Sequence, residues 1–151
     1  MSWIARGIPA TLASLFLLLA AGGCTTTLDG NWEGEMDCGD WGDVDLEFDL
    51  QQSQGQMYTG EGEISGLFYN NDPATLTFEI EVTKFKLSGP QEVDTEIDDC
   101  EIEISGLGTY DEDCDEPDNV EWDGEDELTG EVEDFLGTGY DCDFEVDRKR
   151  R

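Results

Sequence analysis

The sequence predicts an all-β domain, built as a single antiparallel meander of about eight strands that forms a β-barrel or a β-sandwich. Apolar and acidic residues alternate with a period of two through most of the chain after residue 30, which is typical of strands with one buried face. Runs rich in glycine, proline, asparagine and aspartate separate these segments and indicate turns. No segment in this region shows a 3.6-residue apolar period with helix caps.

Residues 1–23 differ in composition and are expected to form an N-terminal signal helix that is removed on export. Residues 1–7 carry one positive charge and no acid, and the almost wholly apolar residues 8–21 follow them. A basic start, an apolar centre and small residues before a cut point are typical of a secretory signal peptide. The apolar run is shorter than the roughly 20 residues that span a bilayer as a helix.

The expected strands follow in order along the chain. The clearest is residues 43–50, in which every second residue is apolar and the residues between them are acidic. A bulge or tight bend is expected near Thr83 and Lys84, because the apolar phase shifts there to Phe85 and Leu87. The other candidate strands are residues 32–38, 58–64, 76–82, 100–104, 120–122, 128–132 and 140–146.

Two local patterns refine this arrangement. The Asp123-Gly124 pair suits a tight hairpin between two of the expected strands. Residues 62–67 and 102–107 share the pattern Glu-Ile-Ser-Gly-Leu. Repeat arrays normally need three or more copies, so the similarity indicates shared strand-to-turn chemistry, with duplication as the alternative.

The charge balance excludes several classes of function. The chain has 39 acidic residues, 7 basic residues and no histidine, for a formal net charge of -32. All the acids lie between Asp29 and Asp147, where Lys84 and Lys86 are the only basic residues, so this stretch carries 2 - 39 = -37. Such a surface repels phosphate backbones and disfavours binding to nucleic acid. The lack of histidine excludes Ser-His-Asp and Cys-His catalysis and any histidine-ligated metal site.

The acidic residues allow two interpretations. They occupy the outward phase of most expected strands, which is typical either of adaptation to high salt or of simple solubility. Residues 111–118 begin as D-x-D-x-D, a spacing of oxygen ligands that suits calcium. Glu116 and Trp122 stand where a calcium loop of the EF-hand type needs glycine and a bidentate glutamate. We therefore expect weak divalent cation binding, with no specific metal site and no cofactor.

Residues 19–24, Leu-Ala-Ala-Gly-Gly-Cys, resemble the lipobox of bacterial lipoproteins, with Ala21 where leucine is usual. In that family the cysteine receives fatty acyl chains such as palmitate and becomes the N-terminus after cleavage. The resemblance implies lipidation at Cys24, a signal peptide over residues 1–23, a lipidated tether over residues 24–29 and an antiparallel β domain over residues 30–151. Thr25 stands where the family's inner-membrane members carry aspartate, so the resemblance favours an outer-membrane or cell-surface location.

Lipidation of Cys24 also explains the odd number of cysteines, because it leaves four that can pair. Four cysteines in an oxidising compartment allow two disulfides in three connectivities. We expect Cys38 to pair with Cys142, which joins the first and last strands, and Cys100 to pair with Cys114, which closes a short loop. A zinc site is disfavoured because no C-x-x-C pair is present.

Gly30-Asn31-Trp32, at the start of the first expected strand, resembles the G-x-W motif of lipocalins and other calycins. In that family the tryptophan closes the base of the barrel and an arginine near the end of the last strand packs over it. The resemblance implies that Arg148 takes this place. The C-terminal basic residues 148–151 are expected to pair with acids of the same chain rather than with anionic lipid.

We therefore expect a non-enzymatic, lipid-anchored extracytoplasmic β domain with a structural, envelope or surface-interaction role. The membrane is its expected partner, through the N-terminal anchor. The alternative is a calycin-like module that binds a small molecule or a cation. No catalytic nucleophile motif, phosphate-binding loop or dinucleotide fingerprint is present. An open apolar cavity would favour the alternative, and a barrel filled by its own side chains would favour the first interpretation.

Overall fold

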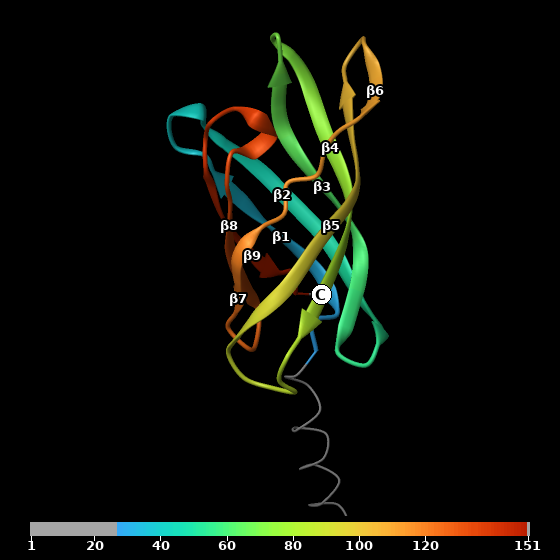
Figure 1. The fold of residues 1–151 in the computed structure, drawn as a ribbon, viewed down its shortest axis with the longest axis vertical. Helices are drawn as coiled ribbons and strands as arrows, with labels where there is room; N and C mark the ends of the chain where they lie inside the picture. The colour runs from blue at the N-terminus through green and yellow to red at the C-terminus, as the bar shows by residue number, and fades with distance from the viewer. Residues whose placement is uncertain (1–26, 151) are drawn as a thin grey trace, which may run out of the picture.

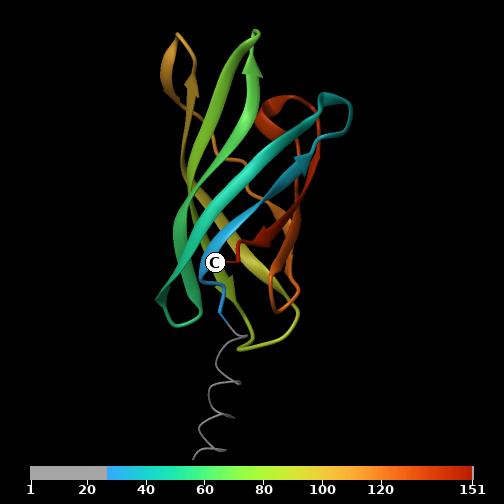
Figure 2. The same cartoon turned by 180° about the vertical axis from the view of Figure 1, so that it is seen from behind.

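The computed structural model describes residues 27–150, and there the chain forms a closed antiparallel β-barrel (Figures 1 and 2). Eight strands close the barrel in the order β1-β2-β3-β4-β5-β7-β8-β9, because β4 pairs with β5 and β9 pairs with β1. The strands are β1 (Gly30–Asp37), β2 (Asp43–Gln54), β3 (Met57–Tyr69), β4 (Asp72–Lys84), β5 (Gln91–Ile104), β6 (Gly108–Asp111), β7 (Asp118–Trp122), β8 (Glu127–Val132) and β9 (Cys142–Arg148). The all-β class is confirmed, and the barrel is the form adopted.

Strand β6 lies outside the barrel wall and pairs with the end of β5. Strands β5 and β7 are in register only where Gln91 faces Trp122 and Glu92 faces Glu121. Residues 112–117 connect β6 to β7 along the rest of that seam (Figure 1). The β5–β6 hairpin therefore carries a strand, β6, that is not part of the ring of eight.

The sequence missed most of β5 and all of β6. Only residues 100–104 were expected to be a strand, whereas β5 begins at Gln91. Gln91 and Thr95 are buried on the inward phase of β5, so polar residues stand where the alternation should show apolar ones. The expected signal helix lies outside the described residues.

The bend expected near Thr83 is present, because β4 ends at Lys84. Phe85 and Leu87 do not continue a strand and are 66% and 75% exposed. The side chain of Gln91 shapes this loop: its Oε1 accepts hydrogen bonds from the backbone N–H groups of Phe85 and Lys86, both at 2.9 Å. The phase shift therefore marks a loop with exposed apolar side chains.

The two similar segments use their glycines in different ways. Gly66 has φ 85° within a register irregularity between Ile64 and Leu67 of β3. Gly106 has φ 78° in the turn between β5 and β6. Leu67 is buried in the core, whereas Leu107 is exposed. The shared feature is the left-handed glycine. The expected strand-to-turn chemistry is present at Gly106, whereas Gly66 forms an irregularity inside β3, which continues to Tyr69.

Aromatic rings fill the barrel where neighbouring strands carry glycine. A Cβ added to Gly62 would lie 2.4 Å from the ring of Phe78, and one added to Gly130 would lie 2.5 Å from the ring of Phe144. The missing side chains leave room for these rings to lie against the adjacent strand, so the interior packs closely.

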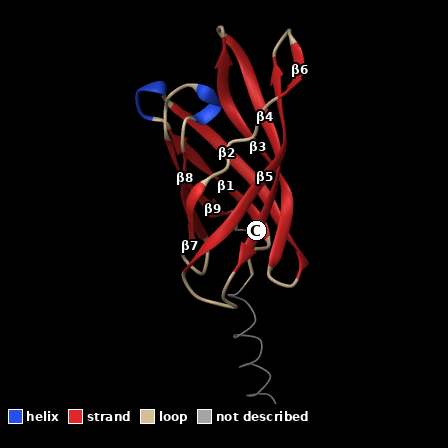
Figure 3. Ribbon diagram, viewed as in Figure 1, coloured by secondary structure: helices blue, strands red, loops and turns tan. Residues whose placement is uncertain are grey.

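The barrel has two distinct ends, which we call proximal and distal. The proximal end holds the beginning of the described chain, the β2–β3 turn, the β4–β5 loop (residues 85–90) and the β7–β8 loop (residues 123–126) (Figure 1). The distal end holds the β3–β4 and β5–β6 hairpin tips and two short 3-10 helices, η1 (Gly39–Trp41) and η2 (Phe135–Gly137), drawn blue in Figure 3. Within residues 27–150, no helix is long and apolar enough to cross a bilayer.

Candidate functional site

Trp32 and Arg148 close the proximal end of the barrel. The guanidinium carbon of Arg148 lies 4.8 Å from the centre of the Trp32 ring. Its Nη1 donates to the carbonyl of Asp29 at 3.1 Å, and its Nη2 donates to the carbonyl of Thr27 at 2.6 Å. Nη2 also donates to the carbonyl of Glu125 at 2.8 Å. Arg148 therefore lies over Trp32, in the place that the calycin resemblance implied.

These contacts change the expected boundary of the tether. Leu28 is fully buried, and its carbonyl accepts a hydrogen bond from the Trp32 indole at 3.1 Å. Thr27 and Asp29 are held by Arg148. Residues 27–29 thus belong to the folded domain and not to a free tether. Cys24 and the expected lipidation lie outside the described residues.

We expect Arg148→Ala to lower the free energy of unfolding by about 2–4 kcal/mol, because it removes charge-assisted hydrogen bonds to three carbonyls. Arg150→Ala is the matched control. Arg150 also contacts Asp126, but its side chain is 87% exposed, so its loss should cost less than about 0.5 kcal/mol. Urea unfolding of both variants measures the difference. Equal losses would show that the contacts of Arg148 do not close the barrel.

Lys84 is a second cation buried at the proximal end, at 5% exposure. Its Nζ lies 5.6 Å from the centre of the Tyr58 ring and 5.3 Å from that of Trp122. It donates to the carbonyl of Leu87 at 3.2 Å. Two aromatic faces and a carbonyl offset the loss of hydration of this ammonium group. The sequence analysis did not single out Lys84 as a core residue.

The barrel interior contains only a small cavity. Its volume is about 70 Å³, and Phe48, Phe78 and Phe144 are among the side chains that line it. Sites for drug-sized ligands usually measure about 300–1,000 Å³. The hydroxyl of Thr95 also lines the cavity and has no hydrogen-bond partner among the described residues. The interior is therefore occupied mainly by the protein's own side chains.

Two disulfides join distant parts of the barrel, with the pairing expected from the sequence. Cys38, which directly follows β1, is bonded to Cys142 at the start of β9, with the Cα atoms 4.1 Å apart. Cys100 is bonded to Cys114 and ties residues 112–117 to β5. Such bonds persist in oxidising compartments, so they indicate an extracytoplasmic domain.

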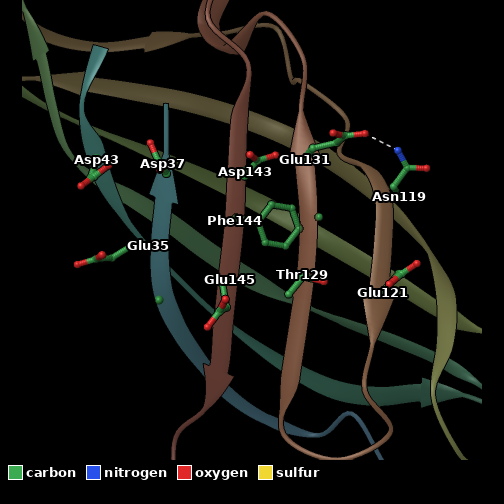
Figure 4. Close-up of a pocket in the computed structure, with 12 residues that line it drawn as sticks. Glu35, Asp37, Asp43, Asn119, Glu121, Thr129, Glu131, Asp143, Phe144 and Glu145 are labelled. Atoms are coloured by element: carbon green, nitrogen blue, oxygen red, sulfur yellow. Dashed lines mark hydrogen bonds between the residues drawn. The ribbon is translucent and has the colours of Figure 1, made fainter. Parts of the chain in front are cut away.

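The outer wall is covered by carboxylates that face one another across the strands. Each of the nine strand pairings places at least one acidic residue directly opposite another. Glu33, for example, faces Glu47 of β2 and Asp147 of β9. Figure 4 shows one such surface, where carboxylates from β1, β9, β8 and β7 line an open groove. Like charges in directly opposed positions destabilise a sheet.

The pKa values of three glutamates on the outer wall are raised. The charge of Asp99 is the main cause that raises the pKa of Glu79, and the charge of Glu81 is the main cause for Glu96. The pKa of Glu127 is raised first by partial loss of hydration and then by the charge of Glu145. The folded state therefore binds protons at these positions more tightly than an isolated carboxyl does.

We expect the protein to become more stable when the pH falls from neutral towards 4.5, the ordinary pKa of a glutamate, at low ionic strength. A pKa raised by folding gives stability that is complete below the unfolded value and is lost as the pH rises through the folded value. The melting temperature as a function of pH tests this. The gain should vanish in molar NaCl, and a melting temperature that falls across this range at low salt would contradict the expectation.

The densest acidic run, residues 111–118, helps to fix the loop between β6 and β7. Asp115 Oδ2 accepts a hydrogen bond from the backbone N–H of Leu136 at 2.8 Å, and its neighbour Cys114 is in a disulfide. Among the described residues, no group of three or more cysteine, aspartate or glutamate side chains is arranged to hold a metal ion. Weak cation binding to this run remains an expectation.

Two other C-terminal basic residues pair with acids of the same chain, as expected. Lys149 Nζ lies 3.0 Å from Glu33 Oε2, and Arg150 Nη2 lies 3.2 Å from Asp126 Oδ2. The pairing with Glu33 raises the pKa of Lys149. All four side chains are well exposed, so these pairs stabilise the fold little.

The remaining surface feature is a set of exposed large apolar side chains, which the sequence analysis did not find. They lie in loops and hairpin tips at both ends of the barrel, where the alternation that marks strands breaks down. The distal end carries Phe68, Tyr69, Leu107, Tyr110 and Tyr140, and the proximal end carries Phe85 and Leu87. Clusters of this kind are typical of surfaces that contact a partner or a membrane.

Comparison with known proteins gave no match to a family model, to a curated protein or to a solved structure.

Proposed function

We propose that the chain is a non-enzymatic, lipid-anchored extracytoplasmic lipoprotein whose β-barrel serves a structural, envelope or surface-interaction role. The observation that carries this proposal is the contrast between interior and surface. The cavity of about 70 Å³ leaves no room for a ligand of ordinary size. The distal end, in contrast, exposes several aromatic side chains, with Phe68 at 68% exposure.

The anchor would set the orientation of the barrel. Lipidation at Cys24 would hold the proximal end, where Thr27 lies, towards the membrane. The β3–β4 and β5–β6 hairpins, at the opposite end (Figure 1), would then point away from it. Their apolar side chains, Phe68, Tyr69, Leu107 and Tyr110, would be available to another component of the cell surface. We place the anchor in the outer membrane, because Thr25 stands where inner-membrane lipoproteins carry aspartate.

The first test is metabolic labelling with palmitate in a bacterial host. The wild-type chain should take up label, and Cys24→Ala should take up none. Thr25→Ala, which keeps the cysteine, is the matched control and should be labelled like the wild type. A wild-type chain without label would refute the anchor.

A calycin-like binding function is the second candidate, and the packing of Arg148 over Trp32 in a closed barrel favours it. A fluorescent fatty acid titrated into the protein separates the two candidates. Our first proposal predicts no saturable change in fluorescence, because the interior is filled by Phe48, Phe78 and Phe144. Saturable binding with displacement by an unlabelled fatty acid would favour the calycin-like function instead.

A further inference from the structure

Two neighbouring loops at the proximal end of the barrel, β2–β3 and β4–β5, differ in charge from the wall. Residues 50–60 and 82–91 are two stretches without any acid. They lie side by side, because Met57 pairs with Thr83 and the Lys84 N–H donates to the carbonyl of Gln56 at 3.0 Å. The second stretch contains both lysines that the chain carries between Asp29 and Asp147. Lys84 is only 5% exposed, so Lys86 is the cation that these two stretches present to solvent. The neighbouring β7–β8 loop carries Asp123, Glu125 and Asp126, and Asp126 pairs with Arg148 and Arg150.

The β4–β5 loop presents apolar groups on this surface. Phe85 is 66% exposed and Leu87 is 75% exposed, and the exposed Lys86 lies between them in sequence. The Gln91 side chain fixes the loop through hydrogen bonds with the backbone of Phe85, Lys86 and Gly89. The apolar side chains are therefore displayed on a loop whose backbone is held in place.

The start of the folded domain lies at the same end. Arg148 Nη2 donates hydrogen bonds to the carbonyl of Thr27 and to the carbonyl of Glu125 in the β7–β8 loop. Gly124 of that loop packs closely against the backbone of Gly89 in the β4–β5 loop. Figures 1 and 2, which show opposite sides, both place the beginning of the described chain and the β4–β5 loop at the same end.

The length of chain between the expected anchor and the barrel is short. Cys24 precedes Thr27 by three residues, which span at most about 11 Å when fully extended. A lipid on Cys24 would therefore keep the proximal end close to the headgroup region of the bilayer. The hydrogen bond from Arg148 fixes Thr27 to the barrel, so this end cannot lift away by unravelling residues 27–29 without losing its closure.

We propose that the β4–β5 loop docks on the phospholipid surface, where Phe85 and Leu87 enter the interfacial region and Lys86 contacts lipid phosphate. This rests on the proposed lipidation of Cys24. Apolar side chains beside a cation are typical of segments that lie in a membrane interface. The docking would add a second attachment to the anchor and fix the direction in which the barrel stands.

Other occupants of this surface fit less well. A second copy of the chain would bring another strongly acidic wall close to the first, which disfavours association. The distal cluster around Phe68 is not an equivalent membrane surface, because the basic residues of the described chain, Lys84, Lys86, Arg148, Lys149 and Arg150, lie in β4, the β4–β5 loop and the C-terminal segment.

The test places a tryptophan in each exposed cluster of the full, lipidated chain. Phe85→Trp reports on the proximal loop, and Phe68→Trp is its matched control, since Phe68 is 68% exposed on the distal hairpin. Both variants are reconstituted into vesicles of phosphatidylcholine and phosphatidylglycerol, with and without brominated lipid, which quenches tryptophan on contact. Wild-type emission is subtracted as background.

We expect the added emission of Phe85→Trp to shift to the blue and to lose most of its intensity with brominated lipid. The added emission of Phe68→Trp should keep its intensity. Lys86→Glu, introduced into Phe85→Trp, should restore part of the lost emission because the acid is repelled by phosphatidylglycerol. Equal quenching of the two tryptophans, or quenching of neither, would overturn the docking proposal.

Flotation of the wild-type vesicles in high salt separates docking from anchoring. If the wild-type chain floats with the vesicles and Phe85→Trp is not quenched, docking is wrong and the anchor stands. If the wild-type chain does not float, both the anchor and the docking that rests on it are wrong. Circular dichroism of each variant establishes that the barrel is folded.

Discussion

We expect replacement of both Cys38 and Cys142 by alanine to lower the free energy of unfolding by about 4.7 kcal/mol. The two residues are 104 positions apart in the sequence, so their bond closes nearly the whole domain into one loop. In the chain-entropy model a longer loop restricts the unfolded state more strongly, and the stabilisation grows accordingly. The bond also joins β1 to β9, the strand pair that completes the barrel.

The matched comparison is the double variant Cys100→Ala/Cys114→Ala. These residues are 14 positions apart, and the same model gives a loss of about 3 kcal/mol. Urea unfolding of both double variants, in one buffer of high ionic strength, measures the difference. Equal losses, or a larger loss for the Cys100–Cys114 pair, would show that loop length does not set the contribution of these disulfides.

Salt is expected to have the other large effect on stability. Carboxylates oppose one another across every strand pairing, and the wall has few cations to neutralise them. The Debye length falls from about 10 Å at 0.1 M salt to about 3 Å at 1 M, so molar salt screens this repulsion. We expect the melting temperature to rise by on the order of 10 °C between low and molar NaCl.

Two substitutions test whether the acidic wall causes the salt effect. Glu79→Gln removes a charge that faces Glu61 and Asp98 in the strand register, and it should raise the melting temperature at low salt. Asp126→Asn removes an acid that pairs with Arg148 and Arg150, and it should lower the melting temperature at low salt. The rise in melting temperature caused by Glu79→Gln should fall towards zero in molar NaCl, because salt screens the repulsion that this variant removes. Equal melting temperatures of the wild type at low and molar NaCl would contradict the account.

The strands that follow strict alternation could be predicted, because the polarity of each side chain decides whether it faces the interior or the outside of the barrel. In residues 43–50 of β2 and 142–147 of β9, every inward residue is apolar or a half-cystine and every outward residue is acidic. Lys84 shows the limit of this reasoning. It lies on the same inward phase as Leu76, Ile80 and Val82 of β4. A lysine is not expected to be buried from its charge alone. The rings of Tyr58 and Trp122, which flank its ammonium group, are known only from the fold.

The surface features were harder to predict because they depend on tertiary packing. Phe85 and Leu87 are apolar, and from the sequence they suggest a strand, but the side chain of Gln91 bonds the backbone on which they stand and turns it into a loop. Leu67 and Leu107 follow the same local sequence and end in the core and in solvent, respectively. Local sequence cannot separate these outcomes, since the neighbouring strands decide them.

The central claim is that the barrel is held at the membrane by lipid on Cys24, and the intact mass of the chain extracted from membranes tests it most directly. The account predicts a chain that begins at Cys24, carries the mass of its acyl groups and is four hydrogens lighter than the reduced form, because of its two disulfides. An unmodified chain of full length, with residues 1–23 still attached, would contradict it.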